Sequence, residues 1–295
     1  MSDLVEVLNK PTFDLRTHES KMELAEALLD APQMRCNVVH RFGPGVYIRE
    51  ASYKAGTLII GQEHVSDHIN MLLKGKINVI DGNGNTVTLE APHMFVSPAG
   101  SKVGYALEDV IWQNIYATNE TNVEVLEQTL FKAPPKYHEY LSKQLEDRTI
   151  YHEVDRQDYR EMIEECGWSA EDIEKVSHYR GDCIPFPYGS YSITQGDSPI
   201  QGKGMFATAD IAEGTVIAPM RLNGCRTPAG FLVNHSKYPN AEAVLTDNGD
   251  MYLVALRDIK GMDGGFNGDE VTISYRHTMR INNLWNGDNK CQQPS

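Results

Sequence analysis

Two short segments in the second half of the chain carry side chains suited to binding. Gly202 and Gly204 flank Lys203, and glycines without side chains let a backbone turn approach a ligand closely. Asn234 and His235 follow the apolar run FLV directly, so we expect both side chains to enter the interior and to need hydrogen-bond partners there. Taken alone, each segment also fits a structural role, in which the glycines form an ordinary loop and the Asn-His pair ties strands together.

A second group of candidate residues lies in the first half, where His64 and His68 are four positions apart. On opposed strand positions the two imidazoles can share one face, and with Gln62 or Asp67 they could hold a divalent metal ion. The alternative is a polar pocket in which these side chains satisfy one another's hydrogen bonds. Both interpretations stay open at this level.

The elements expected to position these residues are mostly strands. From about Val38 to residue 130, short runs rich in β-branched and aromatic residues alternate with glycine, proline and asparagine. The segment DGNGN at 81–85 is a strong hairpin signal. Such a regular succession of strands predicts an antiparallel barrel or jelly roll. Before it, Ser20 and Glu23 have the spacing of a capping box and predict a short helix that ends before Pro32.

Composition changes at Pro134 and Pro135, where an acidic stretch with helical pattern begins. We expect one helix ended by Gly167 and a second opened by Ser169, with the many carboxylates on a solvated face. From residue 184 short strands return, with a hairpin signal at Asn248-Gly249. The predicted organisation is an N-terminal helix and β-barrel (1–132), a helical linker (133–183), a β-rich domain (184–281) and a polar tail (282–295).

The β-rich domain at 184–281 resembles the SET domain, a family of protein-lysine methyltransferases that use S-adenosylmethionine. The resemblance covers residues 184–277 and rests on motifs in a fixed order: GKGMFA at 202–207, DIAEG at 210–214, NHSKYPN at 234–240, ALRDI at 255–259 and GDEVTISY at 268–275. It implies a minimal SET domain in which Tyr275 supplies the catalytic hydroxyl. By the same resemblance the methyl donor would be bound by the residues Gly202, Lys203, Gly204, Met205, Asn234 and His235.

The implied reaction is direct displacement at a sulfonium methyl group by a neutral lysine amine. Alignment of the reacting atoms supplies most of the catalysis, and Tyr275 is suited to orient the methyl group. Desolvation beside a sulfonium cation lowers the pKa of the lysine, so no carboxylate base is required. The sequence departs from the usual SET pattern at two places. The interval from Pro219 to Asn234, where many members carry a substrate-binding insert, is short, and no cysteine module follows the domain. Trp285 could instead cover the adenine or wall the lysine channel.

The first half resembles the cupin family, which consists of small double-stranded β-helix barrels that often hold a metal. Gln62, His64 and His68 occupy the three places of the first cupin motif, and Gly75 follows at the right distance. Where the second motif would have its histidine after PAG, this chain has Val103, which weakens the case for a metal-dependent cupin enzyme. The stretch HVSDH also looks like cupin-like proteins encoded by tailed phages, which implies action in an infected bacterial cell or on a virion.

The chain has 295 residues, 27 lysines and arginines against 41 aspartates and glutamates, and a net charge of -14. This charge argues against binding to nucleic acid, and the sequence holds neither a secretory signal pattern nor an apolar run long enough to span a membrane. The five cysteines are scattered and predict neither a disulfide framework nor a zinc site. We therefore expect a cytoplasmic location.

These observations predict a mainly β chain with a cupin-like barrel joined by a helical linker to a minimal SET domain. The first functional hypothesis is a protein-lysine N-methyltransferase that uses S-adenosylmethionine and acts on a protein or peptide partner, with the cupin-like domain serving docking or homo-oligomerisation. The alternative is a non-enzymatic assembly or virion-associated protein in which both domains are binding scaffolds.

Overall fold

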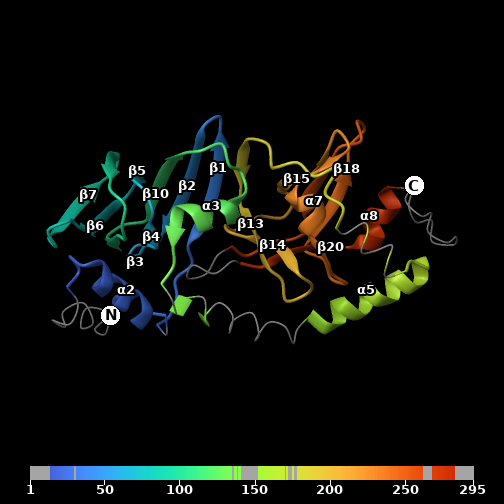
Figure 1. Cartoon of the computed structure of the whole chain (residues 1–295), viewed down its shortest axis with the longest axis horizontal. Coiled ribbons are helices and arrows are strands. Elements are labelled where there is room, and N and C mark those ends of the chain that lie inside the picture. Colours follow the sequence, from blue (N-terminus) through green and yellow to red (C-terminus); the bar gives the residue numbers. More distant parts are fainter. Residues whose placement is uncertain are drawn as a thin grey trace.

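The computed structural model describes residues 14–29, 31–134, 136–137, 139–140, 152–169, 171, 175, 178–261 and 268–282. The described chain is mainly β, as predicted, and its two halves lie side by side along the long axis of the molecule (Figure 1). The strands of the first half are β1 (Asn37–Gly43), β2 (Val46–Tyr53), β3 (Leu58–Ile60), β4 (Glu63–His64), β5 (His68–Lys74), β6 (Lys76–Ile80), β7 (Thr86–Glu90), β8 (His93–Ser97), β9 (Val103–Ala106), β10 (Val110–Ala117) and β11 (Phe131–Lys132).

The strands of the second half are β12 (Gly189–Tyr191), β13 (Ile193–Asp197), β14 (Lys203–Ala207), β15 (Val216–Leu222), β16 (Cys225–Arg226), β17 (Asn234–His235), β18 (Ala241–Leu245), β19 (Met251–Ala255) and β20 (Glu270–Ile273). The helices are α2 (His18–Ala27), α3 (Val123–Leu130), α5 (Glu153–Cys166), α7 (Pro228–Leu232) and α8 (Tyr275–Ile281).

Separate antiparallel sheets make up the first half. One has six strands in the order β12-β1-β2-β10-β5-β8, a second has four in the order β3-β9-β6-β7, and β11 pairs with β4. The central strand β10 alternates buried and partly buried residues along its length, the pattern expected of a strand with one face toward a core. The expected closed barrel is not found among the strands that the structure describes.

The hairpin predicted at DGNGN is confirmed, because β6 and β7 pair across it. The carboxylate of Asp81 accepts hydrogen bonds from the backbone N–H groups of Asn83 and Asn85, at 2.9 and 2.8 Å, which fixes the turn. The second hairpin signal is confirmed as well: β18 and β19 pair around Gly249, whose φ of 85° lies in the left-handed region that glycine favours.

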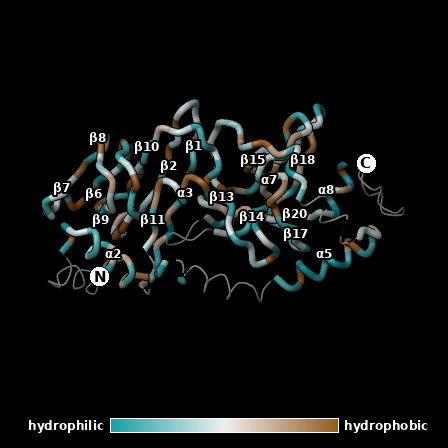
Figure 2. Tube along the Cα trace, viewed as in Figure 1, coloured by the Kyte–Doolittle hydropathy of each residue, from teal (hydrophilic) through white to brown (hydrophobic). Residues whose placement is uncertain are grey.

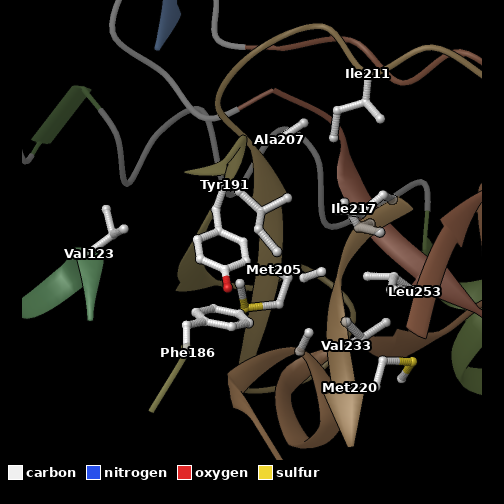
Figure 3. Packing of buried hydrophobic residues seen from close by; sticks show 14 of the residues in the cluster. Val123, Phe186, Tyr191, Met205, Ala207, Ile211, Ile217, Met220, Val233 and Leu253 are labelled. Carbon is white, nitrogen blue, oxygen red and sulfur yellow. The ribbon is translucent and has the colours of Figure 1, made fainter. Parts of the chain in front are cut away.

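The two halves share one sheet and one hydrophobic core. Strand β12, which lies within the range 184–281, pairs with β1 through His40 and Tyr191 and so extends the sheet of the first half. Thr208 adds a second tie, because its hydroxyl donates to the carbonyl of Val38 at 2.7 Å. The core runs from Phe42 on β1 through to the strands of the second half, part of which Figure 3 shows. Burial of this continuous apolar surface holds the halves together.

The second half contains two four-stranded sheets, ordered β13-β14-β20-β17 and β16-β15-β19-β18. All pairs are antiparallel except β17 with β20, which are parallel, with Asn234 opposite Thr272 and His235 opposite Ile273. This parallel pair brings the NHS segment beside the end of the GDEVTISY segment.

The helices agree with the sequence predictions in part. The first helix, α2, begins at His18 and not at Ser20, because the hydroxyl of Thr17 accepts the backbone N–H of Ser20 and caps it. The acidic helix α5 ends at Gly167 as predicted, with a φ of 68°. The second predicted linker helix, from Ser169, lies largely outside the described residues, as does the polar tail after residue 282.

Helix α5 is mostly hydrophilic along its length (Figure 2), yet it does not present all of its carboxylates to solvent. Asp155 and Asp158 are buried, whereas we expected the acidic residues of this stretch to form a solvated face. The same side of the helix carries Met162 and Cys166, which pack with Met279 of α8. The prediction failed for these two aspartates because α5 docks onto the second half.

Candidate functional site

Three of the segments singled out in the sequence meet at one place. The chain leaves β20, Ser274 caps the N-terminus of α8, and Tyr275 is the first residue of that helix. Because β20 runs parallel to β17, Tyr275 then lies beside His235, with ring centroids 5.3 Å apart. The backbone N–H of Tyr275 donates to Nδ1 of His235 at 3.1 Å.

The hydrogen bonds of His235 define its protonation. Nδ1 accepts from the Tyr275 backbone, so the ring proton sits on Nε2, which donates to the carboxylate of Asp158 at 2.8 Å. Burial lowers the pKa of His235 and outweighs the opposing effect of Asp158, so the imidazole is neutral near pH 7. A neutral, oriented imidazole with both nitrogens engaged is a positioning group for the backbone of Tyr275.

Asn234 holds the glycine turn in place. Its Nδ2 group lies within hydrogen-bond distance of the backbone carbonyls of Gln201 and Lys203, at 3.2 and 3.1 Å, and of Oε1 of Glu270 at 2.8 Å. It also reaches the hydroxyl of Ser198 at 3.0 Å. The side-chain donors are therefore used within the protein, which is the strand-tying arrangement that the sequence left open. Contact between Asn234 and a methyl donor stays a prediction, and backbone atoms of Asn234 would have to make it.

The two glycines of the GKG turn serve different purposes. Gly202 has a φ of 54°, and a Cβ at this position would meet no atom within 4 Å. At Gly204 a Cβ would collide with Oε1 of Glu270, so the room that we expected a ligand to use is filled by a carboxylate of the protein. Glu270 accepts the hydroxyl of Ser198 at 2.8 Å, and burial raises its pKa.

The close approach of Glu270 predicts that Gly204→Ala destabilises the protein by about 2 kcal/mol, since the carboxylate must leave its hydrogen bonds to Asn234 and Ser198. Urea unfolding measures this change. Gly82→Ala is the control because a Cβ there meets nothing within 4 Å. Equal stability of the two variants would contradict the packing described for Gly204.

The remaining residues predicted to bind the cofactor have their side chains engaged elsewhere or lie outside the described chain. Lys203 forms ion pairs with Glu124 and Asp197, both at 3.0 Å. Met205 is 1% exposed and lies in the core beside Phe186, as Figure 3 shows. The structure does not describe Trp285. The side chains of Lys203 and Met205 are thus engaged within the protein, and the cofactor contacts that the SET resemblance implies for them stay a prediction.

The hydroxyl of Tyr275 faces the strand-forming NHS segment. It donates to the carbonyl oxygen of Val233 at 2.8 Å, while the ring packs edge-on against Tyr159 of α5. Burial raises the pKa of Tyr275 above its usual value, so the hydroxyl stays protonated at neutral pH. It is therefore not a proton acceptor for a lysine, but the lone pairs of its oxygen can contact a polarised C–H group.

Sequence reasoning missed the acidic residues that support the site. Asp158 accepts from His235 and also from Nη1 of Arg276, at 2.6 Å, whereas Asp155 accepts the hydroxyl of Ser236 at 2.8 Å. A signal was present, because residues 155, 158, 159, 162 and 166 recur at the three- and four-residue spacing of one helix face. That face mixes aspartates with tyrosine, methionine and cysteine, which is typical of a docked helix face with buried polar contacts.

The first half contains a second polar cluster, at the candidate metal residues. His64 on β4 and His68 at the start of β5 are buried, and their rings stack with centroids 4.0 Å apart. Nδ1 of His64 is 2.5 Å from the hydroxyl of Tyr116. His68 donates from Nδ1 to the carbonyl of Ser66 at 3.0 Å, and its Nε2 accepts from Nζ of Lys102 at 2.7 Å.

Other candidate metal ligands do not join this pair. Asp67 is exposed and accepts the backbone N–H of Ala99 at 3.2 Å, and Gln62 is only partly buried. Within the described part of the chain, no three histidine, cysteine, aspartate or glutamate side chains are arranged to hold a metal ion. The set His64, His68 and Gln62 therefore stays a prediction, and its third member, Gln62, is of a residue type outside these four.

Comparison with known proteins adds information on the fold alone. No protein-family model matches the sequence, and no curated protein matches it. None of the described helices has the length and apolar character needed to cross a lipid bilayer.

Solved structures of cupin-domain proteins are similar to parts of the chain. A cupin-2 domain protein from Shewanella frigidimarina is 14% identical over 26% of this chain and 74% of its own, with a TM-score of 0.22. A cupin superfamily protein from Desulfitobacterium hafniense is 14% identical over 31% and 84%, with a TM-score of 0.24. A cupin domain from Bordetella pertussis is 13% identical over 29% and 96%, with a TM-score of 0.25. The chain is thus similar to cupin-domain proteins over about a quarter to a third of its length.

Proposed function

We propose that the chain is a protein-lysine N-methyltransferase that uses S-adenosylmethionine, with its site where β14, β17 and α8 meet. The observation that carries the proposal is the convergence of three sequence-distant segments. Asn234 reaches the carbonyl of Lys203, while its neighbour His235 accepts the backbone N–H of Tyr275. These are the segments on which the resemblance to SET domains rests, and a chance resemblance would not require them to meet.

The residues present fit a methylated sulfonium in two respects. The space at Gly202 is open, so a ligand can approach the turn there. The hydroxyl of Tyr275 donates its proton in a hydrogen bond to the carbonyl of Val233. The lone pairs of the hydroxyl oxygen are then available to contact a positively polarised methyl group. S-adenosylmethionine, when bound, would supply the methyl group on an already activated leaving group.

The protein's part in this reaction is positioning. His235 fixes the start of α8 through the Tyr275 backbone, and Asp158 fixes His235 in turn. Tyr275 orients the methyl group and takes no proton, because burial raises its pKa. Desolvation next to the sulfonium charge would lower the pKa of the acceptor lysine, which would release its proton to solvent water before transfer.

We propose a protein or peptide carrying the acceptor lysine as substrate, because the net charge of -14 favours a cationic partner.

The first half would provide docking or self-association. Its edge strand β8 exposes Met94 and Val96, by 62% and 69%, next to Ile69 and Leu73 of β5. Clustered exposed apolar side chains at an open sheet edge are typical of an association surface. We further propose a cytoplasmic setting, in an infected bacterial cell if the likeness to phage proteins holds.

Calorimetric titration of S-adenosylmethionine into the full chain tests the proposal. We expect micromolar binding, about -8 kcal/mol, and no heat from methionine or adenosine alone as control ligands. Incubation with methyl-labelled donor and lysine peptides should then transfer label to lysine. Absence of both binding and transfer in a folded sample would contradict the proposal.

A non-enzymatic assembly protein is the second candidate. The observation that favours it is the internal engagement of side chains predicted to bind the donor, in particular Lys203 with Glu124 and Asn234 with Glu270. In that case both halves are scaffolds, and the convergent segments serve only to hold the second half together. The same titration separates the two candidates, since a scaffold has no need of a methyl donor.

A further inference from the structure

The polar cluster of the first half has an excess of positive charge. Lys102 donates to His68, and among the described residues it has no carboxylate partner. A second lysine, Lys21 on α2, donates to the carbonyl of Ser101 at 3.2 Å, directly beside Lys102 in the chain, and it too has no acidic partner within the described structure. One ammonium group thus contacts a stacked pair of imidazoles, and a second lies near the first, both without an acidic partner among the described residues.

The acidic residues of this region are bound elsewhere. Glu63 lies 3.5 Å from His18 and 3.7 Å from Lys132, and Asp67 caps a backbone N–H group. Farther in, Glu127 pairs with Arg49 at 3.3 Å. None of these carboxylates is within ion-pair distance of Lys102 or Lys21. Among the described residues, the cluster thus lacks the counter-charge that a partly buried ammonium group normally has.

Several hydrogen-bond donors remain available in the cluster. Tyr116 can donate to Nδ1 of His64, which places the ring proton on Nε2 and leaves that N–H for a ligand. Lys102 uses one of its three N–H groups on His68. Gly100 pairs with His64 across a β-bridge, and a Cβ added at Gly100 would meet no atom within 4 Å, so space exists along this edge of the cluster.

We propose that His64, Lys102 and Lys21 form a binding site for a small oxyanion, a carboxylate or a phosphate group, at the position where cupin-like spacing predicts a metal. Nε2 of His64 and Nζ of Lys102 would donate charge-assisted hydrogen bonds to it.

The same arrangement disfavours a divalent cation. A metal ion would need the lone pair on Nε2 of His68, which already accepts from Lys102. Displacing the lysine would leave its ammonium group close to a dication in a partly buried space, which is repulsive. An anion reverses the sign of this interaction and supplies the missing counter-charge.

The test is calorimetric titration of the full chain with inorganic phosphate and, separately, with acetate and malonate. We expect one site per chain for at least one of these probes, and the probe that binds identifies phosphate or carboxylate as the preferred group. Lys102→Met should weaken binding about tenfold or more. Lys54→Met is the matched control, since that lysine is 73% exposed and pairs with Asp109, outside the cluster. If Lys102→Met fails to fold, Lys21→Met replaces it with the same expected direction.

Histidine-selective ¹H–¹⁵N spectra provide a second readout. Bound anion should shift the resonances of His64, because Nε2–H of that ring would donate a hydrogen bond to it. Binding of phosphate and carboxylate with equal affinity by wild type and Lys102→Met, or no binding by either, would overturn the proposal. So would stoichiometric Zn²⁺ binding that His68→Ala abolishes. The result is independent of methyl transfer, because the cluster lies in the other half of the chain.

Discussion

Replacing Tyr275 by phenylalanine should lower the rate of methyl transfer by about 100-fold or more while S-adenosylmethionine binding changes by only about two- to threefold. The ring keeps its packing against Tyr159, so the local structure survives. What disappears is the hydroxyl, whose oxygen would orient the methyl group in the transition state under the proposed function. The carbonyl of Val233 also loses its donor, at a cost of about 1 kcal/mol in stability.

The measurement is single-turnover transfer of labelled methyl to a lysine peptide, alongside calorimetric donor binding and a thermal melt. Tyr188→Phe serves as control, because that tyrosine is 51% exposed and its hydroxyl contacts Asn119 away from the site. Unchanged turnover in Tyr275→Phe would remove Tyr275 from the catalytic role and with it the main mechanistic part of the proposal.

Asp158→Asn should destabilise the protein by about 2 to 4 kcal/mol at pH 7. Asp158 is buried and accepts from both His235 and Arg276, so the neutral amide leaves a guanidinium without its nearest counter-charge. The amide can also turn its NH₂ group toward Nε2–H of His235, which would force a change of tautomer. That change would break the bond to the Tyr275 backbone and lower methyl transfer.

The pH dependence of stability gives Asp158 a separate signature. Burial by itself raises the pKa of this carboxyl, but the hydrogen bond from His235 and the charge of Arg276 outweigh it, so the pKa lies below the usual value. The native state then binds the proton less readily than the unfolded chain. The contribution to stability is present above about pH 4, the unfolded pKa, and is lost as the pH falls through the native pKa.

Urea unfolding between pH 2.5 and pH 7 checks this behaviour, with about one unit between samples. Asp158→Asn should lose less stability on acidification than the wild type. Glu164→Gln on the same helix is the control, because its side chain is exposed. Equal stability of Asp158→Asn and the control at pH 7 would show that the docking of α5 does not depend on this carboxylate.

Local signals predicted the local structure well. The DGNGN and Asn248-Gly249 hairpins are set by turn residues within a few positions, and Gly167 ends α5 through its own left-handed backbone. The strand pattern likewise predicted a mainly β chain. Whether the strands form a closed barrel could not be predicted in the same way. Closure depends on which distant strands pair, and the pattern within each strand does not specify its pairing partner.

The candidate site could be predicted where its residues lie in ordered motifs and not where tertiary docking decides. Gly202, Asn234 and His235 were singled out by residue type and Tyr275 by the resemblance to SET domains, whereas Asp158 lay in an acidic stretch that resembled an ordinary solvated helix. At the first-half cluster, counting from the PAG turn pointed to Val103. The side chain that reaches His68 is instead that of its neighbour Lys102, because successive strand residues face opposite sides.

The pairing of β12 with β1 affects the order in which the chain can fold as it leaves the ribosome. Arg41 and Ser190 face each other in this pair, with a sequence separation of 149. Until residue 190 has been synthesised, β1 is an unprotected edge, and its residue Phe42 lacks Tyr191 as a ring partner. The six-stranded sheet of the first half therefore stays incomplete until β12, which is synthesised late, can pair with β1. Such a high contact order slows folding and makes this interval the time of greatest exposure to aggregation or chaperone binding.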